Sequence, residues 1–144
     1  MEIATIGFTQ TSAEHFFGRL RAAGVHRLLD VRLHNVSQLA GFAKGQDLAY
    51  FVRELLRGTY VHDLRLAPTA EMLSAYRAKM QSWASYETDF LALMEERGVL
   101  RILDRAAFET KTALLCSEAR PECCHRRLVA ELLGEAWGLN VEHL

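Results

Sequence analysis

Short apolar runs alternate with segments of helical periodicity along the whole chain, and this alternation restricts the fold more than any other feature. Five runs rich in apolar and β-branched residues predict strands, namely 3–6, 25–32, 59–62, 112–116 and 140–144. Strands that alternate with helices favour a mostly parallel sheet covered on both faces. We therefore expect an α/β fold, a single-domain three-layer sandwich that spans residues 1–144.

Apolar stripes and end signals locate the helices between these runs. The first stripe includes Phe16 and Leu20, with Thr11 or Ser12 as its N-cap and Gly24 after its last turn. Because a strand, this helix and a second strand follow within about thirty residues, they predict a βαβ unit with parallel strands. The later helical predictions cover 48–56, 69–80, 85–97 with Ser85 as the N-cap, and 121–137, while the segment 99–108 fits a short helix slightly better than a strand.

The composition argues against several classes of protein. Of 144 residues, 50% are hydrophobic and 24% are charged, and the formal net charge of −1 gives no indication of binding to nucleic acid or membranes. No apolar run is long enough to cross a membrane, and no basic leader with an apolar core indicates a signal peptide. The 3 cysteines lie close together, which predicts reduced thiols in a cytoplasmic protein.

The segment 112–127 concentrates most of the reactive side chains. A predicted buried strand ends at Cys116, and Pro121 occupies the first turn of the predicted helix, where its missing N–H would have had no partner. In an open α/β sheet, the loop that leaves the carboxyl end of a strand is where ligands bind. The polar side chains of this loop and helix start are Glu118, Arg120, Cys123, Cys124, His125, Arg126 and Arg127.

Arginines around this loop predict a site for an anionic ligand. The helix start near Pro121 offers unpaired N–H groups and a partial positive charge, and Arg120 and Arg126 lie close to it in sequence. Arg32 ends another predicted strand and reaches the same rim if the strands are neighbours, while Gly7 permits close approach of a backbone. A nucleotide or another phosphate ester is the expected ligand. Surface ion pairs are the alternative role of these arginines.

Four side chains are candidates for catalysis. Cys116 faces a helix N-terminus, which lowers a thiol pKa and predicts a nucleophile, although a free cysteine is more often a small buried apolar residue. Glu118 and His125 are candidate general acids or bases. Alternatively, Glu118 holds an arginine and His125 is a hydrogen-bonded core residue. Asp30 lies on the same side of its strand as Arg32, so the two either pair or divide their roles.

Cysteine and histidine also raise the question of a metal site. Cys116, Cys124 and His125 are ligands of the zinc type, with Glu118 or Cys123 as a fourth. Two features oppose this interpretation: no C-x-x-C pair is present, and adjacent residues such as Cys124 and His125 point about 100° apart on a helix. We therefore assign no metal ligand, leave the cofactor open, and expect a packed thiol and a core histidine.

Two further groups carry weaker signals. Trp83, Tyr86 and Phe90 recur at helical spacing, which predicts core packing rather than a platform for stacking bases. Gly7 is followed by no G-x-G-x-x-G pattern, so a dinucleotide-binding loop is not indicated.

Four motifs of the chain are similar to those of one known family. They are Thr5-Ile6-Gly7-Phe8-Thr9; Asp30-Val31-Arg32, followed by Ser37 and Gly41-Phe42; C-x-E-x-x-P-x-x-C-H-R at 116–126; and the terminal Val141-Glu142-His143-Leu144. Together they resemble the domain of unknown function 488 family. Asn35 stands where that family usually has a proline, and its L-G-G element after the third strand is absent. The resemblance implies a compact α/β fold and a loop with Ser37 and Lys44 over the site, and it implies no particular activity.

The sequence thus predicts a small cytoplasmic α/β domain whose polar cleft binds an anionic small molecule, with or without catalysis. The residues specify no substrate, cofactor or oligomeric state. Two alternatives stay open. One is a non-catalytic interaction protein in which the segment 116–126 is a structural latch, and the other is a metal-dependent enzyme. The cleft requires that the strand ends at Arg32 and Cys116 lie at the same rim of the sheet.

Overall fold

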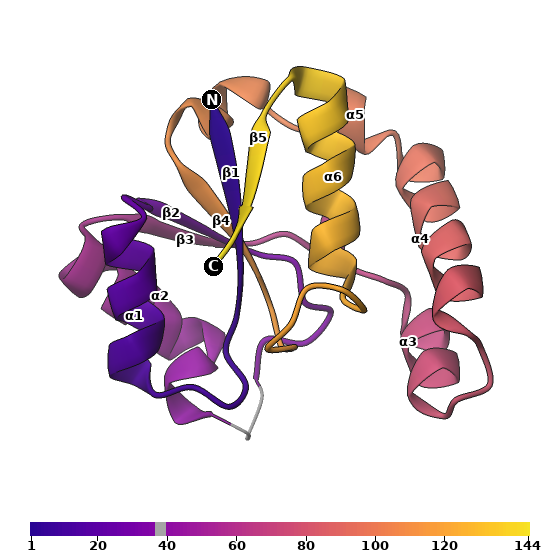
Figure 1. Cartoon of the computed structure of the whole chain (residues 1–144), viewed down its shortest axis with the longest axis horizontal. Coiled ribbons are helices and arrows are strands. Elements are labelled where there is room, and N and C mark those ends of the chain that lie inside the picture. Colours follow the sequence, from indigo (N-terminus) through magenta and orange to yellow (C-terminus); the bar gives the residue numbers. More distant parts are fainter. Residues whose placement is uncertain (37–39) are drawn as a thin grey trace.

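Five strands form one sheet, as the alternation of apolar runs and helices predicts (Figure 1). The computed structural model describes residues 1–36 and 40–144. The strands are β1 Glu2–Gly7, β2 Arg27–Asp30, β3 Thr59–His62, β4 Thr112–Cys116 and β5 Asn140–His143, in the spatial order β3-β2-β4-β1-β5. Every pairing among these strands is parallel, which confirms the predicted fold class.

Helices cover both faces of the sheet and complete three layers. One face carries α1 (Ala13–Ala22) and α2 (Gly45–Leu56), and the other carries α6 (His125–Trp137) and α4 (Trp83–Arg97), with α3 (Ala70–Arg77) and α5 (Val99–Ile102) beside α4 (Figure 1). Short 3-10 turns occupy Gly41–Ala43, Leu64–Leu66 and Arg105–Glu109. Each face has its own core, because successive strand residues point to opposite sides: Leu28 packs with α1 and α2, and Leu29 packs with α4 and α6.

β4 lies between β1 and β2, although it follows both in the sequence. The strands of the predicted βαβ unit are therefore parallel but do not pair with each other. All five residues of β4 are buried, so this strand suits the middle of the sheet. The chain leaves β1 and β2 toward the face with α1 and α2, whereas it leaves β4 toward α6. Connections that diverge in this way open a crevice at the carboxyl ends of the strands.

Side-chain caps, rather than periodicity, set where two of the helices begin. Ser12, not Thr11, caps α1 by accepting a hydrogen bond from the helix backbone. The predicted cap at Ser85 is wrong, because the Ser82 hydroxyl accepts from the Ser85 N–H and α4 begins at Trp83. The apolar stripe of α4 is the same with either start, so the stripe alone did not distinguish the two serines.

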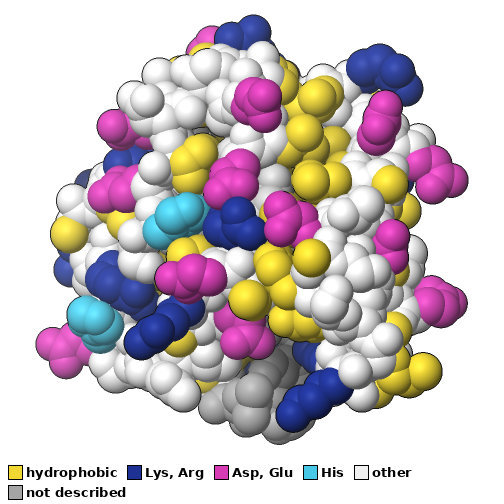
Figure 2. All heavy atoms as spheres, turned by 45° about the vertical axis from the view of Figure 1, so that its right-hand side comes forward, with side chains coloured by type: hydrophobic (Ala, Val, Ile, Leu, Met, Phe, Trp, Pro, Cys, Tyr) yellow, Lys and Arg dark blue, Asp and Glu magenta, His cyan; other side chains and the backbone are white. Residues whose placement is uncertain are grey.

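The surface carries charges of both signs. In Figure 2, basic and acidic side chains are scattered over the face shown, and hydrophobic side chains gather in a band between them. This mixture agrees with the net charge of −1. Among the described helices, none combines the length and the apolar composition that a membrane span requires.

Candidate functional site

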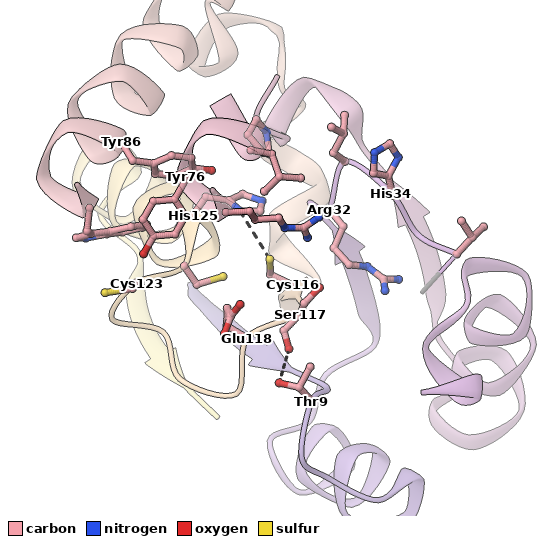
Figure 3. A pocket seen from close by; sticks show the side chains of 17 residues that line it. Thr9, Arg32, His34, Tyr76, Tyr86, Cys116, Ser117, Glu118, Cys123 and His125 are labelled. Atoms are coloured by element: carbon pink, nitrogen blue, oxygen red, sulfur yellow. Dashed lines mark hydrogen bonds between the residues drawn. The ribbon is translucent and has the colours of Figure 1, made fainter. Parts of the chain in front are cut away.

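A cavity of about 570 Å³ lies at the carboxyl ends of β2 and β4, where the connections diverge. Cys116, the last residue of β4, and Arg32, just beyond β2, both line it (Figure 3). Glu118 and His125 line it as well. The structure therefore brings these four residues from the sequence analysis around one space, with both strand tips at the same rim.

Cys116, Cys124 and His125 form the floor of this cavity, and there a thiol lies next to an imidazole. The Sγ atom of Cys116 lies 3.6 Å from Nδ1 of His125 (Figure 3). On the far side of the ring, Nε2 lies 2.7 Å from the carbonyl oxygen of Val31. Since a carbonyl oxygen only accepts, Nε2 carries the proton, and a neutral ring then presents its Nδ1 lone pair to the thiol.

The helix of this segment begins later than its proline predicts. A turn follows Pro121, closed by the Cys124 N–H donating to the Pro121 carbonyl at 3.1 Å, and α6 begins at His125. The predicted start at Pro121 is therefore wrong. As the N-cap residue, Cys124 is extended, with φ −134° and ψ 135°. Cys124 and His125 consequently do not diverge as helical neighbours do, and their ligand atoms and that of Cys116 all lie within 4.8 Å of one another.

The two buried thiols differ in acidity. A hydrogen bond from the Cys124 thiol lowers the pKa of Cys116, aided by the Ser117 N–H and the charge of Arg126 and opposed by burial. The same hydrogen bond, together with burial, raises the pKa of Cys124. Cys116 is therefore the more acidic of the two thiols.

Arg126 is fully buried and holds the loop from below the cavity. Its Nη1 donates to the carbonyl oxygen of Glu118 and lies 3.8 Å from Cys124 Sγ. None of the ion pairs among the described residues includes Arg126. Burial is the main cause that lowers the pKa of Arg19 and of His143, and the charge of Arg126 is the second cause for both. This rim of the sheet thus carries a positive charge that no carboxylate neutralises within the described part of the chain.

Gly7 lets the loop after β4 pass directly over the end of β1. A Cβ atom at this position would lie 2.6 Å from the carbonyl carbon of Glu118, closer still to its oxygen, and 2.9 Å from Nη1 of Arg126. Thr9 ties the same loop down, because its N–H and its hydroxyl both donate to the Ser117 carbonyl, at 3.1 and 2.9 Å. Gly7 does not line the cavity, and its contacts position the loop that does.

Asp30 lies beneath the cavity and pairs with Arg32, the first of the two roles considered for it. Arg32 donates to this carboxylate from its backbone N–H, Nε and Nη2, at 3.1, 2.9 and 2.7 Å, and the Tyr60 hydroxyl donates at 2.6 Å. Burial alone would lower the pKa of Arg32, but the hydrogen bonds to Asp30 outweigh it and raise the pKa. Burial, followed by the charge of Asp30, raises the pKa of Tyr60.

Three aromatic side chains, Tyr76, Trp83 and Tyr86, form one wall of the cavity, here called the aromatic wall. Figure 3 labels Tyr76 and Tyr86 of this wall. Trp83 and Tyr86 stack with ring centroids 5.3 Å apart and planes 24° from parallel. Tyr86 is buried, as its helical spacing predicts, whereas Trp83 is half-buried and faces the cavity. Helical spacing identified the core side of α4, and the packing of α3 against α4 decides which of its rings face the cavity.

Residues around the mouth divide into three groups. Arg77 and His34 line the cavity and were missed by the sequence analysis, because neither belongs to a motif or to a strand end. Arg120 is exposed and is not among the lining residues. Lys44 lies at the start of α2 and does not line the cavity either, and Ser37 lies outside the described residues.

Comparison with known proteins gave one match. A family model described as "Domain of unknown function DUF488" matches residues 12–133. The matched range contains the Asp30–Arg32 pair and the whole segment 116–126, and it leaves out β1 with Gly7. No curated protein and no solved structure matched the chain.

Proposed function

This chain belongs to the family described as domain of unknown function DUF488, a description that names no activity, and we propose one from the cavity at its strand ends. The protein is an enzyme that binds an anionic small molecule with a planar ring, such as a nucleotide, and acts on it at the floor of the cavity. The observation that carries the proposal is the 3.6 Å contact between Cys116 and His125 at the floor of a cavity of about 570 Å³. The free thiols among the described residues favour a cytoplasmic location.

The aromatic wall supports a ligand with a planar ring. The half-buried Trp83 and the partly buried Tyr76 present aromatic side chains to the cavity, and the buried Tyr86 stacks with Trp83 in the same wall. Stacking of a base on such a ring contributes about 1–3 kcal/mol and tolerates any base. A ligand with a planar ring is therefore a better occupant than a purely aliphatic one.

The charges around the cavity support an anionic ligand. Arg126 is buried below the loop, and no carboxylate pairs with it within the described residues. The N-terminus of α6 begins at His125, next to the floor, and adds its own positive end. Arg77 is exposed at the mouth and lines the cavity. These groups attract a phosphate or carboxylate from solution and favour its binding in the cavity.

Glu118 limits which anions fit. It is the acidic side chain among the cavity-lining residues, and it is exposed at the mouth. A carboxylate repels a bare phosphate but accepts hydrogen bonds from hydroxyl and amino groups. A ligand with a sugar or amino group toward Glu118 and its phosphate toward Arg77 satisfies both, which favours a nucleotide over inorganic phosphate.

A structural latch is the second candidate function of the segment 116–126, and one observation favours it. Arg126 donates hydrogen bonds to the carbonyl oxygens of Glu118 and Ala119 and to Cys124 Sγ, so this side chain already has protein partners. In that case the cavity has no ligand, and the family motif serves only to fold the loop. Ligand binding distinguishes the two functions.

Thermal unfolding with three probes tests the proposed function. At equal millimolar concentrations, we expect adenosine monophosphate to raise the Tm of the wild-type chain more than adenosine or inorganic phosphate does, because only the first combines ring and phosphate. Arg77→Gln is expected to weaken binding about tenfold or more, since a hydrogen bond to a charged group contributes about 1.5–3 kcal/mol. The matched control is Arg101→Gln, an exposed arginine of α5 outside the cavity, which should leave the shift unchanged. A wild-type Tm that no probe raises would support the latch instead.

A further inference from the structure

We propose that Cys116, Cys124 and His125 bind a divalent cation of the zinc type at the floor of the cavity. The inference deepens the proposed function, because it names a cofactor for the same site, and it rests on that function only for the ligand that would occupy the remaining coordination position. The donor atoms themselves are two thiol sulfurs and one imidazole nitrogen, a set that suits zinc.

Convergence of the donors is the first support. The two Sγ atoms and the ring nitrogen lie within 4.8 Å of one another, and all three residues are buried. They come from two different elements, the end of β4 and the start of α6, which the parallel sheet holds at the same rim. The extended backbone of Cys124 is what allows two adjacent residues to aim at one point. The divergence expected of helical neighbours therefore does not occur at Cys124 and His125.

The orientation of His125 is the second support. Its Nε2–H donates to the Val31 carbonyl at 2.7 Å, so Nδ1 is left with its lone pair toward Cys116. A metal-binding histidine commonly donates its second ring N–H to a carbonyl or carboxylate, which fixes the tautomer and the ring plane. The hydrogen bond to Val31 already holds the ring of His125 in this orientation, so metal binding requires no rotation of the ring.

Charge balance is the third support. Two thiolates neutralise a divalent cation, and Arg126 Nη1 lies 3.8 Å from Cys124 Sγ and donates to that sulfur. The positive charge of Arg126 is then left over, and an anionic ligand in the cavity would balance it. The metal and the anion therefore favour each other.

Access decides which kind of metal site this would be. All three proposed ligands line the cavity, so one side of the ion faces open space. Zinc sites with three protein ligands and one open position are of the catalytic type, and two cysteines with one histidine are a known catalytic set. Glu118 lines the same cavity and stands as the fourth ligand or as a proton acceptor beside it.

Metal binding by the whole reduced chain, without any organic ligand, tests this inference. After removal of metal with a chelator and full reduction of the thiols, zinc is added and its content measured by elemental analysis, and cobalt is added and its thiolate charge-transfer absorption recorded. We expect about one ion per chain with cobalt bands of tetrahedral thiolate coordination. Cys116→Ser, Cys124→Ser and His125→Asn should each weaken binding by more than about a hundredfold, since loss of a mere outer-shell partner already costs about tenfold to a hundredfold.

His15→Asn is the matched control for His125→Asn, because His15 is exposed on α1, outside the cavity, and is not part of the cluster. It should bind metal as the wild type does. Absence of any stoichiometric ion in the reduced wild type, or an equal loss with His15→Asn, would overturn the inference. The readout is independent of adenosine monophosphate: an ion that binds while no anion raises the Tm would leave the metal site standing and remove the proposed function.

Discussion

Asp30→Asn is expected to lower the free energy of unfolding by about 3–5 kcal/mol. The substitution leaves the Arg32 guanidinium only 3% exposed and without its carboxylate. Asp30 accepts three hydrogen bonds from Arg32 and one from Tyr60, so one change disturbs four contacts. Urea denaturation followed by tryptophan fluorescence measures the loss.

The chain contains its own control for this prediction. Asp63 and Arg65 repeat the geometry of Asp30 and Arg32 almost atom for atom, with the backbone N–H, Nε and Nη2 donating at 3.0, 2.9 and 2.7 Å. The difference is exposure, because Arg65 is 49% exposed. Solvent therefore stabilises Arg65 when its partner is removed, and Asp63→Asn should cost about 1 kcal/mol or less.

A double variant separates the charge from the packing. Asp30→Asn combined with Arg32→Met removes the unpaired charge as well as the carboxylate, and buried pairs replaced by apolar side chains are often neutral. We expect the double variant to be more stable than Asp30→Asn alone. Equal losses in Asp30→Asn and Asp63→Asn, or a double variant no better than the single one, would show that burial of Arg32 is not what makes Asp30 necessary.

The pH dependence of Asp63 provides a further check. Burial alone would raise the pKa of Asp63, but hydrogen bonds from the side chain and backbone of Arg65 outweigh it and lower the pKa. The pKa of this carboxyl is lower in the folded than in the unfolded chain, where it is about 3.9. The ionised carboxyl therefore stabilises the fold at pH values above the unfolded pKa, and this stabilisation is lost as the pH falls through the folded pKa. The difference in stability between the wild type and Asp63→Asn should therefore shrink below about pH 4.

Gly7→Ala is the second prediction with a large effect, a loss of about 1–3 kcal/mol from overpacking. The added Cβ would lie 2.6 Å from the carbonyl carbon of Glu118, which is backbone and cannot rotate away. The loop after β4 must then move off β1 and release its contacts with Thr9 and Arg126. We expect lower stability in urea denaturation and weaker cobalt binding at the floor, because the displaced loop connects Cys116 to Cys124.

Gly18→Ala is the matched control for that change. Gly18 lies inside α1, is exposed, and a Cβ there meets nothing within 4 Å. Alanine should stabilise the chain by about 0.5–1 kcal/mol, since glycine is the poorer helix former. Opposite signs for the two glycine variants are thus expected, and a neutral Gly7→Ala would mean that the loop is not tightly seated on β1.

The fold followed from the sequence because it depends on periodicity, which is local. The run from Thr112 to Cys116 has no polar interruption, and it forms a strand that is buried on both faces. Helix starts depend on single hydrogen bonds, and there the predictions failed. In the structure Ser82, and not Ser85, caps α4, and Pro121 begins a turn instead of a helix.

Only the part of the site that follows from the parallel arrangement of the strands could be predicted. Parallel strands end at one rim, so Arg32 and Cys116 were expected to share a cavity, and they line the same one. The convergence of Cys124 with His125 was not predictable, because it depends on one extended residue at the start of α6. Arg77 and Trp83 line the cavity through the packing of α3 and α4, which no local pattern encodes.

The place of β4 also decides when the molecule becomes complete during synthesis. β1 pairs with β4 and β5 and with no other described strand, so it has no strand partner until residue 112 has left the ribosome. A nascent chain of the first hundred residues contains only the β2–β3 pair among these pairings, and it leaves both edges of β1 and one edge of β2 without their partner strands. The centre of the sheet and the cavity therefore form together, late, and a product truncated before β4 would be a substrate for chaperones and proteases rather than a partly active protein.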